Sequence, residues 1–134
     1  MRDKASGARR PLIVIPARFS PNATALRYEA EVTARALAEA VFSAGGEPLS
    51  VHPYAPSLTI DIDAVRERIW FADGVLLPGG GDVAARWSGQ QPHPSQYGVD
   101  EEQDAFDLAV ARVALADYLP LLAVCRGTQI VNVA

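Results

Sequence analysis

The sequence has few of the residues that bind metal ions or form covalent cross-links. It contains one cysteine, Cys125, and two histidines among its 134 residues. A single cysteine cannot form an intrachain disulfide, nor can it supply a zinc site built from several cysteines. His52 and His93 lie in proline-rich segments, without the close spacing of a helical metal site. We therefore expect no metal and no other cofactor.

Long apolar runs and an excess of positive charge are also missing. The apolar run at residues 12–15 is too short for a membrane span or a signal-peptide core, so we expect no membrane association and a cytoplasmic location. Basic residues cluster in residues 1–10, which we expect to form a flexible leader. Residues 11–134 hold eight Lys or Arg against fifteen Asp or Glu, a net charge of −7. This acidic body argues against nucleic acid as a partner.

Short apolar runs alternate with helical patterns along the rest of the chain. The length and the 49% hydrophobic content suit one domain, which we place at residues 11–134. The patterns predict strands at residues 12–15, 49–51, 74–77 and 121–124, and helices at residues 26–44, 61–69 and 100–114. Such alternation predicts an α/β fold with a parallel sheet and helices on both faces, as in flavodoxin-like proteins.

Residue spacing and capping residues set the limits of the predicted helices. The first helix rests on apolar residues at three-four spacing, namely Ala30, Ala34, Leu37, Ala38 and Val41. Gly45 and Gly46 supply its stop. Asp61 reads as the cap of the second helix, and Asp100 with Gln103 resembles a capping box at the third.

Cys125 stands between the strand at residues 121–124 and a helix-like segment that follows it. Ala123 precedes it by two residues and Gly127 follows by two, which is the layout of a nucleophile elbow. The positive end of the following helix and the guanidinium of Arg126 would favour the thiolate, the form that attacks carbonyl carbons. The alternative is a small buried thiol at the end of a core strand.

A glycine run follows the third predicted strand, at residues 79–81. Chemistry in parallel sheets collects at the carboxyl ends of strands, so this run, Cys125 and Arg18 should reach one edge. Glycines let backbone amides approach a developing negative charge, although a flexible turn is the commoner fate of such clusters. Asp82 could orient a substrate or cap a turn. Arg18 and Tyr28 read as surface or packing residues.

Two strings together carry a family resemblance. Residues 123–129, Ala-Val-Cys-Arg-Gly-Thr-Gln, and residues 76–82, Leu-Leu-Pro-Gly-Gly-Gly-Asp, resemble the class I glutamine amidotransferase superfamily. The Cys-Arg-Gly form, the Gly-Gly-Asp-Val segment and residues 100–107 look most like its gamma-glutamyl-gamma-aminobutyrate hydrolase branch. The resemblance covers nearly all of residues 11–134.

The resemblance implies roles for the matched positions. Cys125 would attack the carbonyl carbon of a small gamma-glutamyl amide and form a thioester. The backbone amides of Gly80 and Arg126 would form the oxyanion hole, and Gln129 would help to hold the glutamyl group.

A cysteine hydrolase also needs a base, usually a histidine oriented by a carboxylate. The resemblance implies that this pair follows the elbow in a segment absent from the sequence, which reads as the truncated N-terminal part of a domain. His52 and His93 read as loop residues. We therefore expect little turnover by this chain alone, and exposed apolar surface that favours a homo-oligomer or a complementing C-terminal segment.

Three functions remain open on these grounds. The first is hydrolysis of gamma-glutamyl amides through Cys125. The second is a non-catalytic amidotransferase-like fragment that binds a glutamyl ligand or a partner. The third is a glutaminase domain that supplies ammonia to a synthase.

Overall fold

A four-stranded parallel sheet forms the centre of the molecule. A computed structural model describes residues 8–23 and 28–134 of the chain. The strand order is β4-β1-β5-β6, with bounds β1 (Leu12–Pro16), β4 (Glu47–Val51), β5 (Gly74–Leu77) and β6 (Leu121–Ala123). All three neighbouring pairs are parallel, and Leu76 on β5 lies opposite Leu122 on β6. The predicted α/β fold is confirmed.

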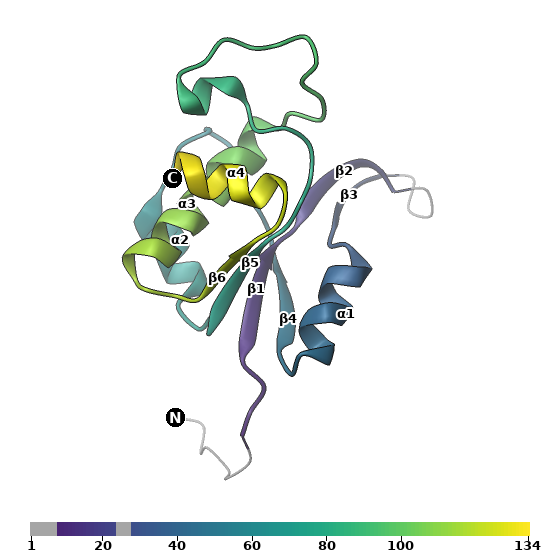
Figure 1. Cartoon of the computed structure of the whole chain (residues 1–134), viewed down its shortest axis with the longest axis vertical. Helices are drawn as coiled ribbons and strands as arrows, with labels where there is room; N and C mark the ends of the chain where they lie inside the picture. The colour runs from purple at the N-terminus through teal and green to yellow at the C-terminus, as the bar shows by residue number, and fades with distance from the viewer. Residues whose placement is uncertain (1–7, 24–27) are drawn as a thin grey trace.

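Helices pack on either side of this sheet (Figure 1). Helix α1 (Arg35–Ser43) lies beside β4, whereas α2 (Ile62–Ile69), α3 (Glu101–Ala116) and α4 (Arg126–Val133) lie together on the other side. Asp61 caps α2 by accepting a hydrogen bond from the Ala64 amide, as predicted. In the described residues, no helix is long and apolar enough to cross a membrane.

The segment before α1 differs from the prediction. Two antiparallel strands, β2 (Arg18–Ala23) and β3 (Tyr28–Val32), stand where a loop and the first half of a long helix were expected. The predicted helix start at Leu26 lies outside the described residues, as do residues 1–7 of the expected leader. The alanine spacing fits a helix, but Tyr28 and Val32 suit a strand and the hairpin supplies their backbone partners. Helix α1 therefore begins only at Arg35.

The core lies between the sheet and α3. On this helix Phe106, Ala109, Val110, Val113 and Ala114, which form the predicted apolar stripe, are all buried. They pack in one cluster with β1, β5 and α2, represented by Val14, Leu77 and Ile69. Three polar side chains of α3, Gln103, Asp104 and Asp107, are buried as well. Their partners lie at the carboxyl edge of the sheet.

Candidate active site at the ends of strands β5 and β6

Cys125 occupies a sharp turn between β6 and α4. Its backbone has a φ of 52° and a ψ of −111°, a conformation that residues with a side chain rarely adopt. The amide of Val124 donates to the Leu77 carbonyl, so the chain stays paired with β5 up to the turn. The thiol is exposed rather than buried in the core. This strained strand-to-helix turn has the geometry of a nucleophile elbow.

Gly127 allows α4 to start close against β5. A Cβ at this position would lie 2.9 Å from the Cβ of Leu77 and would clash with the Leu77 carbonyl oxygen. Only glycine fits there without a shift of the backbone. The small residue expected two positions after Cys125 is thus required by the contact between α4 and β5.

The glycine run approaches the elbow from the end of β5. A Cβ on Gly79 would lie 3.5 Å from the Cβ of Cys125, so the backbone of this loop passes beside the thiol. Gly80 is exposed, and a Cβ on it would lie 3.1 Å from Arg18 Nε. Asp82 accepts a hydrogen bond from the Tyr97 amide, which is the turn-capping alternative expected for it. The glycine run therefore lies against both the elbow and Arg18.

The sequence predicted that the guanidinium of Arg126 lies near the thiol, but the structure directs it to two carboxylates instead. Its side chain is 4% exposed and contacts the carboxylates of Asp104 and Asp107 on α3. Its backbone is the first residue of α4, directly after Cys125. The N-terminus of α4 thus remains as the source of positive potential beside the sulfur.

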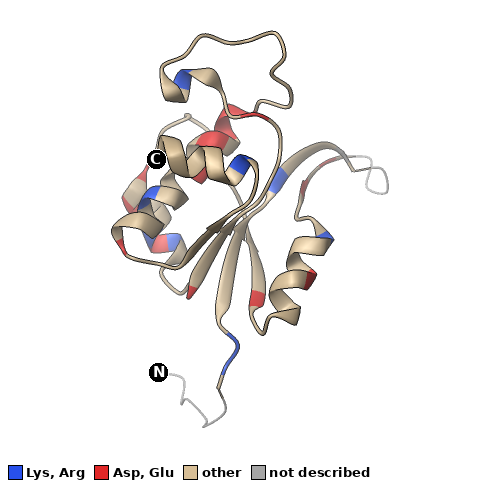
Figure 2. Ribbon diagram, in the orientation of Figure 1, with Lys and Arg blue, Asp and Glu red and all other residues tan. Residues whose placement is uncertain are grey.

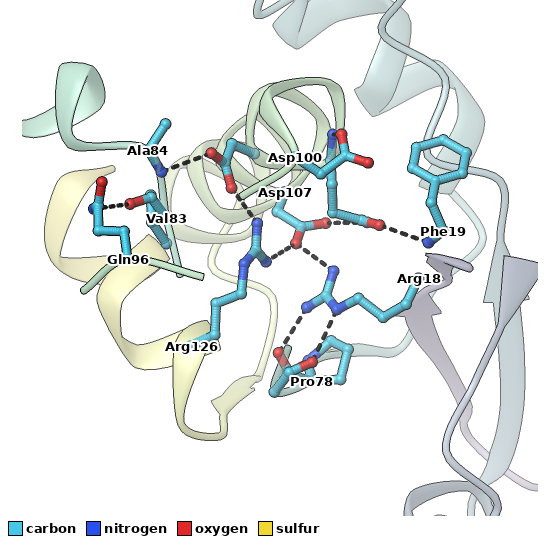
Figure 3. A network of polar contacts seen from close by, with 12 residues as sticks. Arg18, Phe19, Pro78, Val83, Ala84, Gln96, Asp100, Asp107 and Arg126 are labelled. Carbon is cyan, nitrogen blue, oxygen red and sulfur yellow. Dashed lines mark hydrogen bonds and ion pairs between the residues drawn. The ribbon is translucent and has the colours of Figure 1, made fainter. Parts of the chain in front are cut away.

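Arg18 joins the same buried cluster from the other side (Figure 3). It donates from Nη1 to Asp107 Oδ2 over 2.6 Å, from Nη2 to the Pro78 carbonyl over 2.6 Å and from Nε to the Gly79 carbonyl over 2.9 Å. Its side chain is 15% exposed. Of the two roles expected for Arg18, surface residue or packing residue, the structure therefore fits the second, and Arg18 is a structural part of the edge.

Burial sets the ionisation of this cluster. It lowers the pKa of the Arg18 guanidinium, and the charge of Asp107 opposes that shift. It raises the pKa of the Asp107 carboxyl, and the charges of Arg18 and Arg126 oppose it. Each buried charge therefore depends on its oppositely charged neighbours. Figure 2 shows basic segments at the starts of β2 and α4 near the acidic start of α3.

Gln103 has a different role from the one its capping-box position suggested. Asp100 caps α3 by accepting from the Gln103 amide, as expected. The Gln103 side chain, however, donates to the Ala17 carbonyl over 2.7 Å and accepts from the Phe19 amide over 3.1 Å. These two backbone groups flank Arg18. Gln103 therefore fixes the backbone from which Arg18 extends.

The remaining candidate residues lie at different distances from the elbow. Gln129 is exposed on α4, one turn after Cys125. His52 follows β4 at the far side of the sheet, and three strand spacings of about 4.8 Å separate that strand from β6. Its Nδ1 contacts Glu31 of β3, a carboxylate partner that sequence spacing did not reveal. His93 Nδ1 bonds to Ser95 Oγ in the loop after the glycine run.

Sequence reasoning missed the buried polar residues of α3. Asp107 lies three residues before Val110 and seven before Ala114, so it falls within the apolar stripe of the helix. A carboxylate at a core position requires a partner, because an unpaired buried charge is costly. That position within the stripe was the signal available, although it could not name Arg18 and Arg126 as the partners.

Comparison with known proteins gives consistent results. Residues 11–134 match the family described as Peptidase C26. A glutamine amidotransferase-like protein of Rickettsia prowazekii is 31% identical over 96 residues, which cover 71% of this chain and 32% of that protein. A protein of Mycobacterium tuberculosis named as a glutamine amidotransferase is 33% identical over 96 residues, covering 72% of this chain and 30% of the relative. The chain thus spans about a third of the length of these relatives.

The family match covers both strings that first suggested a resemblance, the glycine run and the elbow. It also covers the buried cluster of α3 and the parallel sheet that carries them. The resemblance to amidotransferase-like proteins is confirmed at the level of the family, while the finer branch stays a prediction. The chain belongs to the Peptidase C26 family.

Proposed function

We propose that Cys125 is the nucleophile of a hydrolase that acts on gamma-glutamyl amides through a thioester. The elbow at Cys125 carries this proposal, because its positive φ presents an exposed thiol at the N-terminus of α4 and beside the backbone of Gly79. A structural cysteine would not need a strained backbone at an exposed position. Family membership supports hydrolase-type chemistry in general.

The reaction has two steps. The Cys125 thiolate attacks the gamma-carbonyl carbon, a C–S bond forms, and the C–N bond breaks as the leaving amine takes up a proton. Water then cleaves the thioester, releasing glutamate and restoring the thiol. In each step a negative charge develops on the carbonyl oxygen, where the amides of Gly80 and Arg126 would donate. Such a donor can contribute about 3 kcal/mol. Gln129 would hold the glutamyl group.

The amine-leaving step needs a proton donor. His52 and His93 are the histidines of this sequence, and His52 follows the strand farthest from β6. We therefore expect slow turnover of amides by the 134-residue chain, with the base supplied from outside these residues. A gamma-glutamyl p-nitrophenyl ester avoids this requirement, since its leaving group departs without a proton.

The ester therefore gives a direct test. The chain is mixed with the gamma-glutamyl ester, quenched in acid and examined by intact mass and peptide mapping. We expect one glutamyl group on Cys125 and none on the Cys125→Ala variant. The matched alpha-glutamyl ester should acylate the chain at least about tenfold more slowly, because the loss of about one contact between substrate and pocket slows a reaction by that factor.

Two results would contradict the proposal. Equal labelling of the Cys125→Ala variant would place the nucleophile elsewhere. An unlabelled thiol in the unmodified chain would favour a non-catalytic binding fragment.

Glutamine is a second candidate substrate, because the relatives carry the names of glutamine amidotransferases. Its amide has the same gamma-glutamyl group, and ammonia would be the leaving group. Glutamine and gamma-glutamyl-aminobutyrate should then compete with the ester for Cys125. The substrate that protects the thiol at the lower concentration is the better ligand. Protection by glutamine alone would favour the ammonia-supplying function over the hydrolase.

A further inference from the structure

The two proposed oxyanion-hole amides are tied to the same buried carboxylate. Asp107, on α3, receives Arg18 from the side of the glycine run and Arg126 from the side of the elbow. Both contacts are to its Oδ2 atom, and the carboxylate is fully buried. Figure 3 shows both guanidiniums directed at Asp107. One side chain thus links the ends of β5 and β6.

On the glycine side the link passes through a single peptide unit. Arg18 Nε donates to the Gly79 carbonyl oxygen, and this carbonyl belongs to the same planar unit as the Gly80 amide. In a trans peptide the N–H points opposite to the C=O. Holding the Gly79 oxygen therefore sets the direction of the Gly80 N–H. The bond from Arg18 Nη2 to the Pro78 carbonyl fixes the preceding unit as well.

On the elbow side the link passes through Arg126 itself. Its side chain is anchored on Asp104 and Asp107, while its backbone amide is the second proposed donor. The anchored side chain restricts rotation of the first residue of α4. The two donors are consequently held relative to one another through Arg18, Asp107 and Arg126.

The cluster has the composition of a scaffold rather than of a ligand site. The guanidinium nitrogens of Arg18 all donate to groups of this chain, two of them to backbone carbonyls. The two arginines face two aspartates, so the four charges sum to zero. A substrate carboxylate would have to displace a buried partner in order to bind Arg18.

We propose that Asp107 is a positioning residue that sets the geometry of the oxyanion hole through Arg18 and Arg126. This inference rests on the proposed function, because it assumes that the Gly80 and Arg126 amides bind the oxyanion. The hydrogen bonds of the Asp107 side chain go to Arg18, Gln103 and Arg126, so it acts through the two arginines. Its loss should impair attack on a carbonyl carbon while leaving the reactivity of the thiol itself unchanged.

Two reagents separate these effects. The gamma-glutamyl p-nitrophenyl ester reacts through an oxyanion, whereas iodoacetamide alkylates the thiol by displacement at a saturated carbon. For the Asp107→Asn variant we expect the maximal acylation rate to fall about 100-fold, which is the loss that one misplaced oxyanion donor causes. The ester concentration that gives half of the maximal rate should not rise to match. Alkylation should stay within about twofold of the unmodified chain, because it needs no oxyanion donor.

Further variants keep the test decisive. Arg18→Met removes the link to the glycine run, leaves Asp107 paired with Arg126, and should show the same selective loss even where Asp107→Asn fails to fold. The acylation rate of the double variant should be little lower than that of either single variant, because both substitutions break the same chain of contacts. Asp117→Asn, which breaks an ion pair with Arg66 at the surface, is the control and should leave both rates unchanged.

The outcomes are separable from those for the proposed function. Unchanged acylation, or equal losses with both reagents, in Asp107→Asn and Arg18→Met would overturn the positioning role. If the unmodified chain is alkylated but never acylated, the proposed function fails.

In that case the amide NMR signals of Gly80 and Arg126 test the positioning role of Asp107. A shift of both signals in Arg18→Met, absent in Asp117→Asn, supports the link, and unmoved signals refute it.

Discussion

Cys125 shows how a single residue can be held in an unfavourable conformation. Its φ of 52° and ψ of −111° lie outside the regions that side-chain-bearing residues prefer. The surrounding contacts impose this conformation, since Val124 is bonded to β5 and Gly127 starts α4 against the same strand. The strain lifts the sulfur out of the sheet. The backbone conformation that places the thiol at the surface therefore lowers the stability of the fold at this residue.

This strain predicts a stability difference between two variants. Cys125→Gly should relieve the strain, because glycine tolerates positive φ, whereas Cys125→Ala should keep it. We expect the glycine variant to have the larger free energy of unfolding, by about 1 kcal/mol. Urea unfolding followed by circular dichroism measures this difference. An alanine variant as stable as the glycine variant would show that the backbone at the elbow is unstrained.

Among the elements, α4 and β5 are packed as closely as backbone allows. The Leu77 carbonyl accepts from the Val124 amide and also faces the Cα of Gly127. The segment that follows β3 contacts β4 differently, through the side chain of Thr33, whose Oγ1 lies 2.6 Å from Ser50 Oγ. The first contact tolerates no added atom. The second uses exposed polar groups that are easily adjusted.

A substitution at Gly127 tests the closeness of the helix contact. Gly127→Ala places a methyl group against the Leu77 carbonyl oxygen and should lower the free energy of unfolding by about 2 kcal/mol. It should also displace the elbow and slow acylation of Cys125 by the ester. Thr128→Ala, at an exposed neighbouring position on the same helix, is the control. Equal stability of the two variants would mean that α4 can move away from β5 without cost.

At the scale of the whole molecule, one face of the sheet is incompletely covered. Helix α1 packs beside β4, while Leu122 on the edge strand β6 is 64% exposed. An apolar groove of about 370 Å³ extends from there to Val41 of α1 and includes Ile13 and Leu76. Contiguous exposed apolar surface of this kind favours association.

We therefore expect the chain to self-associate as its concentration rises. Leu122→Gln should weaken this association, because it replaces the exposed apolar side chain of Leu122 in the groove with a polar one. Leu115→Gln is the matched control, since Leu115 is 50% exposed on α3 outside the groove. Sedimentation equilibrium measures the mass of each variant over a range of concentrations. A monomeric chain at every concentration, or equal effects of both substitutions, would contradict this expectation.

The alternation of apolar runs and helical patterns was enough to predict the parallel sheet, because buried strands and capped helices leave local signals. The runs ending in Leu77 and Val124 and the cap at Asp61 are of this kind. The elbow could also be predicted, since small residues at 123 and 127 around a cysteine are a local requirement. The hairpin could not, because Ala30 fits either a helix or a strand and pairing with Ser20 of β2 decided between the two.

Only the tertiary structure decided the partners of the buried charges. Arg18, Asp107 and Arg126 are separated by 89 and 19 residues, and no spacing rule links them. They meet because the parallel sheet brings the ends of β1, β5 and β6 to one edge and α3 packs across it. Local sequence determines which backbone conformations are favourable. The ion pairs depend on how those elements pack, because a buried charge is stable only beside a partner that the fold supplies.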